Sequence, residues 1–190
     1  ERKNYDGVFV HMNQEYVLLG GVFWKLFGKK VFLWRNHAYG NMLTRLAVIL
    51  SNKVFYTSPQ SFTARFKNAI QMPVGIDTDF FKPNIEVKRT PNSILFLGRI
   101  APVKKVSEFI DWLKDQNFEI ATIAGSALPK DIEYERMVRE KVHEYKLDNK
   151  IKFVGAVTKE EALRLYQSHE IYVNMTPSGS MDKTVLEAAA

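Results

Sequence analysis

Short apolar runs bounded by turn residues alternate with stretches of helical period along this chain of 190 residues. This alternation is typical of a parallel β-sheet whose strands are joined by crossover helices. In the second half of the chain it predicts four strands, at residues 94–97, 119–123, 151–154 and 171–173. The pattern therefore indicates an α/β fold.

Helical spacing fills the gaps between these strands. Apolar residues recur at the i, i+3, i+4 and i+7 positions of one helical face within residues 106–113, and a second stripe runs through residues 134–145. Thr158 and Glu161 have the spacing of a capping box, so a third helix is expected to begin there. Ser180 is the expected N-cap of a last helix.

The first half of the chain is less regular but follows a related plan. It predicts strands at residues 8–12, 31–34 and 54–57 and helices near residues 15–27, 41–50 and 61–66. Residues 83–92 contain two prolines and several charges but few apolar residues, which indicates a linker. We therefore predict two Rossmann-like parallel-sheet domains, both incomplete: the latter part of an N-terminal domain in residues 1–82, and a truncated C-terminal domain in residues 93–190.

The composition is that of a globular protein, with 46% hydrophobic and 25% charged residues. Lys and Arg outnumber Asp and Glu by 27 to 21, and the net charge of +6 favours an anionic partner such as phosphate, nucleic acid or an acidic lipid headgroup. The lack of cysteine excludes disulfides, a thiolate nucleophile and Cys-based metal sites. A reducing, cytoplasmic setting is the simplest interpretation.

Residues 17–24 form the longest apolar stretch, which is too short to cross a bilayer and predicts a buried helix. The polar N-terminus has no secretory signal. The chain begins without Met and ends within a predicted helix, so we interpret it as a fragment of a longer protein. We expect a cytoplasmic protein, and peripheral association with the inner face of a membrane stays open.

Glycine follows each of the four strands predicted in the second half, as Gly98, Gly125, Gly155 and Gly179. Ligands of open α/β sheets bind beyond the carboxyl ends of the strands, and glycine lets the backbone approach a ligand closely. A single glycine at such a place is more often part of an ordinary turn. Four of them at one edge of a sheet predict a ligand site.

Two cations follow the first of these glycines. Arg99 and Lys104 stand beside a helix start, an arrangement suited to holding a diphosphate through charge and paired hydrogen bonds. The alternative is that the lysine is solvated surface charge. Further along, the small-residue turn 177–180 leads into a helix whose Glu187 is a candidate acceptor of hydrogen bonds from sugar hydroxyls.

Together these features resemble glycosyltransferase family 4. The resemblance covers residues 5–190 and rests on Gly98-Arg99 with Lys104, on Met-Pro-Val-Gly-Ile-Asp-Thr-Asp-Phe-Phe-Lys-Pro at 72–83, on the Phe-Val-Gly turn, and on the Pro-Ser turn that leads to Leu-Glu-Ala. It implies a GT-B fold and metal-independent sugar transfer with retained anomeric configuration. The donor would be a nucleotide sugar, and the acceptor an unknown glycan, lipid or small molecule.

The resemblance also implies roles for individual residues. Arg99 and Lys104 would stabilise the leaving diphosphate, His37 would lie beside the donor sugar, and Glu187 would bind the donor ribose. The family's first glutamate is replaced here by Gly179, so Asp182 or Ser180 is expected to take over part of the contact to the donor hexose. The expected donor-binding residues are Gly98, Gly125, Gly155, Gly179, Ser180, Met181, Asp182, Lys183, Thr184 and Glu187.

Neither a metal nor a cofactor is expected beside the nucleotide-sugar co-substrate. Asp77 and Asp79 have the Asp-x-Asp spacing of a metal-binding pair, but we interpret them as part of the interdomain turn of the family. Lys105 also departs from the family, which commonly has glycine at this position. Two alternatives stay open: a non-enzymatic basic module that binds nucleic acid or an anionic membrane, and a GT-B sugar-nucleotide epimerase. No nucleic-acid partner is expected, because the chain has no aromatic-basic RNA motif and no helix-turn-helix pattern.

Overall fold

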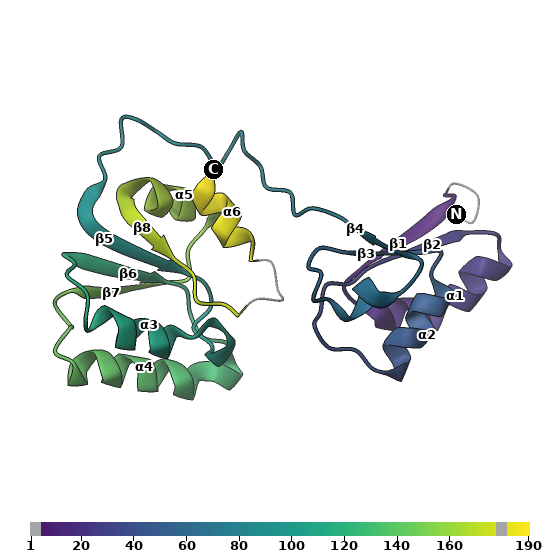
Figure 1. Cartoon of the computed structure of the whole chain (residues 1–190), viewed down its shortest axis with the longest axis horizontal. Helices are drawn as coiled ribbons and strands as arrows, with labels where there is room; N and C mark the ends of the chain where they lie inside the picture. Colours follow the sequence, from purple (N-terminus) through teal and green to yellow (C-terminus); the bar gives the residue numbers. More distant parts are fainter. Residues whose placement is uncertain (1–4, 178–181) are drawn as a thin grey trace. The chain divides into compact units, whose positions relative to one another are not determined.

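The computed structural model describes residues 5–177 and 182–190, which form two compact units (Figure 1). The N-terminal unit extends to Gly75, and the C-terminal unit begins at Ile76. Each unit contains a four-stranded parallel sheet with helices packed against it. This architecture confirms the predicted fold class of two parallel-sheet α/β units.

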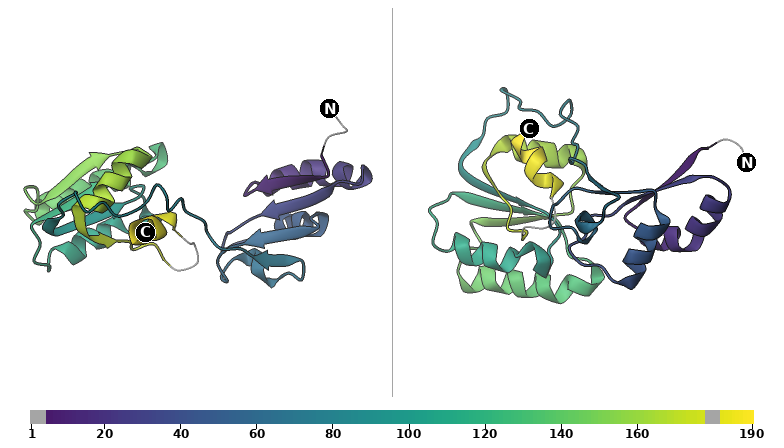
Figure 2. Two further views of the ribbon diagram at one scale, coloured as in Figure 1. Left: turned by 90° about the horizontal axis from the view of Figure 1, so that it is seen from above. Right: turned by 45° about the vertical axis from the view of Figure 1, so that its right-hand side comes forward.

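The N-terminal unit has the strand order β1-β2-β3-β4 and carries its two α-helices on one face of the sheet (Figures 1 and 2). Its elements are β1 (Gly7–His11), α1 (Gln14–Leu26), β2 (Lys30–Trp34), α2 (Met42–Leu50), β3 (Lys53–Tyr56), the 3-10 helix η1 (Phe62–Arg65) and β4 (Ala69–Gln71). Its core joins alternate strand residues to the helices: Val10, Val31, Leu33, Val54, Val17, Ala47 and Val48.

Helix α1 differs from the expectation of a buried helix. Val17 and Gly21 are buried, but Leu19, Phe23 and Leu26 are exposed. The helix itself was predicted correctly, whereas its burial was not, because an apolar run shows no polar face that would reveal which side meets solvent. One apolar face of α1 packs into the core, and a second lies on the surface of the unit.

Local capping explains where α2 begins. The side chain of Asn41 accepts a hydrogen bond from the backbone N–H of Thr44 at 3.1 Å, and the backbone N–H of Asn41 donates to Thr44 Oγ1 at 3.2 Å. Residues 62–65 form a 3-10 helix in place of the expected α-helix. Strand β4 was not predicted, because it has only three residues.

The C-terminal unit has the strand order β7-β6-β5-β8, with α3 and α4 on one face of the sheet and α5 and α6 on the other (Figure 1). Its strands are β5 (Thr90–Leu97), β6 (Ile120–Ala124), β7 (Ile151–Gly155) and β8 (His169–Val173). Its helices are α3 (Val106–Leu113), α4 (Ile132–Glu144), α5 (Lys159–Ser168) and α6 (Lys183–Ala189), with the short 3-10 helices η2 (Pro102–Lys104) and η3 (Pro129–Asp131).

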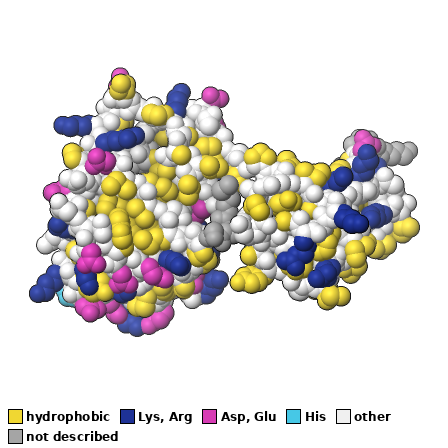
Figure 3. Space-filling view, in the orientation of Figure 1, with side chains coloured by type: hydrophobic (Ala, Val, Ile, Leu, Met, Phe, Trp, Pro, Cys, Tyr) yellow, Lys and Arg dark blue, Asp and Glu magenta, His cyan; other side chains and the backbone are white. Residues whose placement is uncertain are grey.

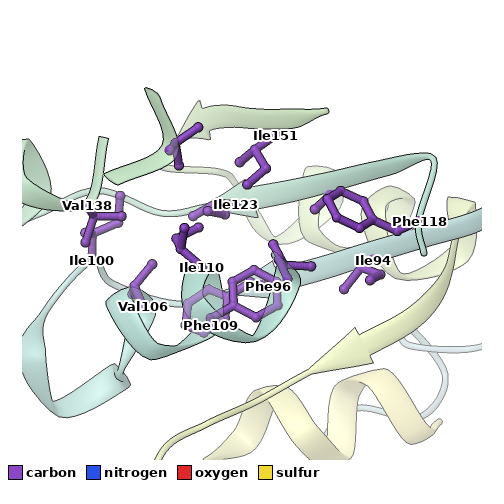
Figure 4. Packing of buried hydrophobic residues seen from close by; sticks show 13 residues of the cluster. Ile94, Phe96, Ile100, Val106, Phe109, Ile110, Phe118, Ile123, Val138 and Ile151 are labelled. Atoms are coloured by element: carbon purple, nitrogen blue, oxygen red, sulfur yellow. The ribbon is translucent and has the colours of Figure 1, made fainter. Parts of the chain in front are cut away.

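The core of this unit lies between the sheet and α3 and α4, as Figure 4 shows. The predicted stripe on α3 supplies four fully buried residues, Val106, Phe109, Ile110 and Leu113. The ring of Phe109 packs against Phe96 of β5, with 5.2 Å between the ring centroids. Burial of such side chains stabilises the fold by about 1.5–3 kcal/mol each, which makes α3 the principal cover of this face.

The boundary between the units precedes the predicted linker. Strand β5 begins inside that segment, at Thr90. The segment before it packs on α5, because Phe81 is buried against the ring of Tyr166 and the carbonyl of Lys82 accepts a hydrogen bond from Gln167 Nε2 at 2.8 Å. Across residues 5–177 and 182–190, none of the helices is both long and apolar enough to cross a membrane.

The start of the last helix also differs from the expectation. Ser180 lies outside the described residues, and the N-cap of α6 is Asp182, whose side chain accepts a hydrogen bond from the backbone N–H of Thr184. The capping box at Thr158 and Glu161 is confirmed at the start of α5.

Candidate functional site

Three of the four glycines lie side by side at the carboxyl edge of the C-terminal sheet. The N–H of Gly98 donates to the carbonyl of Ala124 at 2.9 Å, and the N–H of Gly125 donates to the carbonyl of Gly155 at 2.7 Å. Gly125 has a φ of 144°, and a Cβ there would lie 1.9 Å from the carbonyl oxygen of Gly98. Any side chain at residue 125 would therefore collide with backbone. The fourth glycine, Gly179, lies outside the described residues.

Lys104 lies beside this row of backbone. A Cβ built on Gly98 would lie 3.9 Å from Lys104 Cδ and 4.0 Å from Lys104 Cε. The ammonium donates to Thr176 Oγ1 at 3.3 Å and forms an ion pair with Asp182. Only 17% of the lysine side chain and 14% of the aspartate side chain are exposed. Lys104 therefore lies next to the exit of β5, and its charge already has a counterion in Asp182.

Asp182 is the centre of a polar network at the start of α6. Besides the ammonium, its carboxylate accepts hydrogen bonds from Asn174 Nδ2 at 3.1 Å, from Thr176 Oγ1 at 3.2 Å and from the N–H of Thr184 at 3.4 Å. Burial by itself would raise the pKa of Asp182, but the hydrogen bonds from Lys104 and Asn174 and the charge of Lys104 outweigh it and lower the pKa to about 2. The carboxylate is therefore ionised at neutral pH.

Glu187 joins the same region through two tyrosines. Tyr166 on α5 donates its hydroxyl to Glu187 Oε2 at 3.2 Å, and its ring lies edge-on to Tyr172, with 5.5 Å between the centroids. Tyr172 donates in turn to Thr184 Oγ1 at 2.6 Å. Burial, followed by the nearby Tyr172 and Glu187, raises the pKa of Tyr166, so its hydroxyl stays protonated and remains a donor to the glutamate.

The structure does not bring every candidate residue into this network. Arg99 is exposed, and among the described residues its guanidinium has no hydrogen-bond or ion-pair partner. Lys183 is also exposed. His37 belongs to the N-terminal unit, where it is exposed and its carbonyl accepts a hydrogen bond from the N–H of Phe62 at 2.7 Å. Ser180 and Met181 lie outside the described residues.

Sequence reasoning missed three members of the network. Asn174 and Thr176 follow the end of β8, and Tyr172 lies within it. Asn174 and Thr176 had a signal in the sequence, because polar residues directly after a strand of a parallel sheet lie at the edge where ligands bind; Tyr172, within the strand, had none. The glycine of the following turn is a stronger signal of a ligand site than these polar residues, which are also common in ordinary loops.

Asp77 has a local structural role. Its Oδ1 accepts a hydrogen bond from the N–H of Phe80 at 3.1 Å, and its Oδ2 lies 3.5 Å from the ammonium of Lys159. Within the part of the chain that the structure describes, no group of three His, Asp or Glu side chains is placed to hold a metal ion.

A pocket of about 500 Å³ opens near the carboxyl end of β7. Its lining includes Val154, Ala156 and Val157 from that strand and the turn after it, Leu165 of α5, and Val87. The pocket is mainly apolar and does not include Lys104 or Asp182. It is therefore adjacent to the strand exits but separate from the charged network.

A model of the family described as glycosyl transferases group 1 matches residues 77–190. That stretch contains the glycine exits and the whole Asp182 network. No curated protein sequence matches the chain significantly.

Solved structures show the same fold. HepE of Anabaena, in complex with UDP, superposes with a TM-score of 0.78 at 17% identity, covering 95% of this chain and 56% of that one. Sucrose-phosphate synthase of Thermosynechococcus elongatus gives 0.76 at 16% identity, covering 97% and 53%. The C-terminal domain of LpcC, a glycosyl transferase group 1 family protein of Francisella tularensis, gives 0.53 at 27% identity, covering 60% and 65%. The chain thus spans about half the length of the first two.

Proposed function

This chain belongs to the glycosyl transferases group 1 family, and on that premise we propose that it is part of an enzyme that moves a sugar from a nucleotide-sugar donor to an acceptor. HepE, which has a similar fold, binds UDP and UDP-glucose. The observation that carries the proposal is the position of Lys104, beside the row of strand exits and next to a polar network.

The diphosphate of the donor is proposed to bind between Lys104 and Arg99. An ammonium has three N–H groups, and hydrogen bonds to Asp182 and Thr176 use two of them. The third is available to a phosphate oxygen. Arg99 directly follows Gly98, and its exposed guanidinium can donate two parallel hydrogen bonds to a phosphate.

Glu187 is proposed to bind the donor ribose. Tyr166 donates to Oε2 and holds the carboxylate in one orientation, which leaves Oε1 to accept a hydrogen bond from a sugar hydroxyl. Holding a hydrogen-bond acceptor such as this carboxylate in place before the ligand arrives reduces the entropy lost on binding. The turn at Gly155 is the proposed neighbour of the base.

The proposed chemistry is leaving-group departure with retention of the anomeric configuration. As the bond between the sugar and the diphosphate breaks, negative charge grows on the diphosphate, and the sugar takes on oxocarbenium character. Cations fixed beside the leaving oxygen stabilise that charge more in the transition state than in the ground state. Lys104 and Arg99 would supply the stabilising positive charge without a metal. Asp182 would hold the ammonium in place, and the sugar acceptor stays unassigned.

Calorimetric titration with UDP, GDP and ADP tests the donor site. The double substitution Arg99→Ala with Lys104→Ala should weaken the preferred nucleotide by about 100-fold or more, because each lost charge-assisted hydrogen bond is worth about 1.5–3 kcal/mol. Lys88→Ala with Lys130→Ala removes the same charge from exposed positions of the same unit and should have little effect. Equal binding by both double variants would rule out the proposed diphosphate site.

A polyanion-binding module would behave differently. Its affinity would fall steeply with added salt and would not distinguish one nucleotide base from another. An epimerase would bind nucleotide sugar but would convert it without an acceptor, which product analysis would show.

A further inference from the structure

The segment that follows the start of the C-terminal unit is fastened to the proposed donor site. Residues 77–82, which we call the boundary segment, pack on α5 against Tyr166, the residue that donates to Glu187. From this contact we infer that Phe81 is a positioning residue. It fixes the ring of Tyr166 and thereby the carboxylate that would receive the donor ribose. The inference rests on the ribose role proposed for Glu187.

The ring of Tyr166 contacts two other aromatic rings. Phe81 lies edge-on to it, with 6.1 Å between the centroids and an interplanar angle of 70°, and Tyr172 lies edge-on at 5.5 Å and 79°. Edge-to-face pairs at such separations are favourable beyond the area that they bury. A tyrosine hydroxyl is rigidly attached to its ring, so contacts that fix the ring also fix the donor of the 3.2 Å hydrogen bond to Glu187 Oε2.

The boundary segment is itself held in place around Phe81. This side chain is only 3% exposed, and its backbone N–H donates to the carbonyl of Asp77 at 2.8 Å. The side chain of Asp77 accepts a hydrogen bond from the N–H of Phe80 at 3.1 Å. Gln167 of α5 donates to the carbonyl of Lys82 at 2.8 Å. The segment therefore presents Phe81 to α5 in one defined position.

Lys159, the first residue of α5, adds a second attachment. Its ammonium lies 4.0 Å from the ring centroid of Phe80 and 5.3 Å from that of Phe81, and it is 3.5 Å from Asp77 Oδ2. An ammonium beside an aromatic ring is attracted by the ring's quadrupole. With Gln167 near the end of the helix, the segment is attached to α5 at both ends. A shift of Phe81 relative to α5 would break contacts at both places.

Phe81 differs from an ordinary core phenylalanine in what lies behind its neighbour. Among the described residues, the hydroxyl of Tyr166 has Glu187 as its hydrogen-bond partner. If the ring of Tyr166 shifts, the carboxylate loses its fixed donor and has to be ordered when the ligand binds, which lowers affinity. The contacts proposed for the diphosphate, at Lys104 and Arg99, do not pass through Phe81. Loss of its ring should therefore affect the nucleoside part of the donor alone.

Calorimetric titration of the 190-residue chain tests the inference, with UDP, GDP and ADP, their monophosphates, and pyrophosphate as ligands. Phe81→Leu keeps an apolar side chain but removes the ring. It should weaken binding of the preferred nucleotide by about 3- to 5-fold, no more than the loss expected of Tyr166→Phe. Monophosphate and diphosphate should be affected alike, and pyrophosphate binding should not change. In the Tyr166→Phe background, Phe81→Leu should have no further effect, because the hydrogen bond through which it acts is already absent.

Phe118→Leu is the matched control. Phe118 is also 3% exposed, but it lies on the other face of the sheet, in the core beneath α3 and α4, whose outer surface carries charged side chains of both signs (Figure 3). Its substitution should lower stability without changing nucleotide affinity. Phe81→Met, whose flexible side chain fills irregular gaps, is a second test variant that should also weaken nucleotide binding. Circular dichroism verifies that each variant is folded.

The results separate this inference from the proposed function. A loss of nucleotide affinity that is absent for pyrophosphate and vanishes in the Tyr166→Phe background supports the inference. Unchanged affinity in both Phe81 variants, an equal loss in Phe118→Leu, a parallel loss of pyrophosphate binding, or an additive loss in the Tyr166→Phe background would overturn it and leave the donor site standing. A wild-type chain that binds none of the nucleotides would overturn the proposed function, and this inference with it.

Discussion

Replacement of Asp182 by Asn tests how much the charged network contributes to stability. Asparagine keeps the shape of the side chain and its ability to cap α6, but it removes the counterion of Lys104, whose side chain is only 17% exposed. The pKa of Asp182 lies at about 2 against an ordinary value of 3.8. Each pKa unit corresponds to 1.36 kcal/mol, so the ionised carboxylate stabilises the folded state by about 2 kcal/mol.

The sign of the pH dependence follows from the same shift. Because the folded pKa is lower than the unfolded one, this stabilisation is complete above about pH 4 and is lost as the pH falls toward 2. We therefore expect Asp182→Asn to lower the free energy of unfolding by about 2 kcal/mol at pH 7. The difference between wild type and variant should shrink between pH 4 and pH 2.

Urea unfolding followed by circular dichroism measures this difference at several pH values, with the transition of the C-terminal unit analysed separately if the two units unfold independently. Asp77→Asn is the control, because its pair with Lys159 is about half exposed on both sides and should contribute less than about 1 kcal/mol. The reasoning is refuted if Asp182→Asn costs no more than the control, or if its cost is the same at pH 7 and pH 2.

Three further substitutions give separate tests. Gly125→Ala should destabilise the C-terminal unit by at least about 2 kcal/mol, because the new Cβ meets the carbonyl of Gly98. Gly155→Ala is the control: its Cβ meets nothing within 4 Å, so it should lower the free energy of unfolding less in the same urea titration. Lys105→Gly should stabilise that unit by about 0.5–1 kcal/mol, because Lys105 has a φ of 55°; a lower melting temperature would contradict this. Tyr166→Phe removes the hydrogen bond to Glu187 and should weaken nucleotide binding by about 5-fold in calorimetry, with nucleoside monophosphate and diphosphate affected alike.

Much of the fold was predictable because its periodic signals are local. The stripe from Val106 to Leu113 and the capping box at Thr158 each depend on residues within one helix, and both are confirmed. Strand β4 and the N-cap Asp182 were missed, since a three-residue strand has too little periodicity and the competing candidate Ser180 has the same capping chemistry.

The candidate site was predictable only in part. The strand exits could be placed together, because parallel strands end at one edge, and Gly98, Gly125 and Gly155 do lie there. The pairing of Lys104 with Asp182 could not be predicted, since these residues are far apart in the sequence and meet only after β5 and β8 pair. The exposed face of α1 had no local signal either, because an apolar residue looks the same in sequence whether it is covered or not.

Gly125 limits how this edge of the sheet can vary in proteins built on this plan. A methyl group at Gly125 would already collide with the carbonyl of Gly98, so substitution at this position has no room to alter the surface there. Variation in the shape and charge of this edge would then arise at exposed neighbours such as Ser126 and Ala156. If the proposed function holds, these two positions are the targets for changing which nucleotide sugar is accepted.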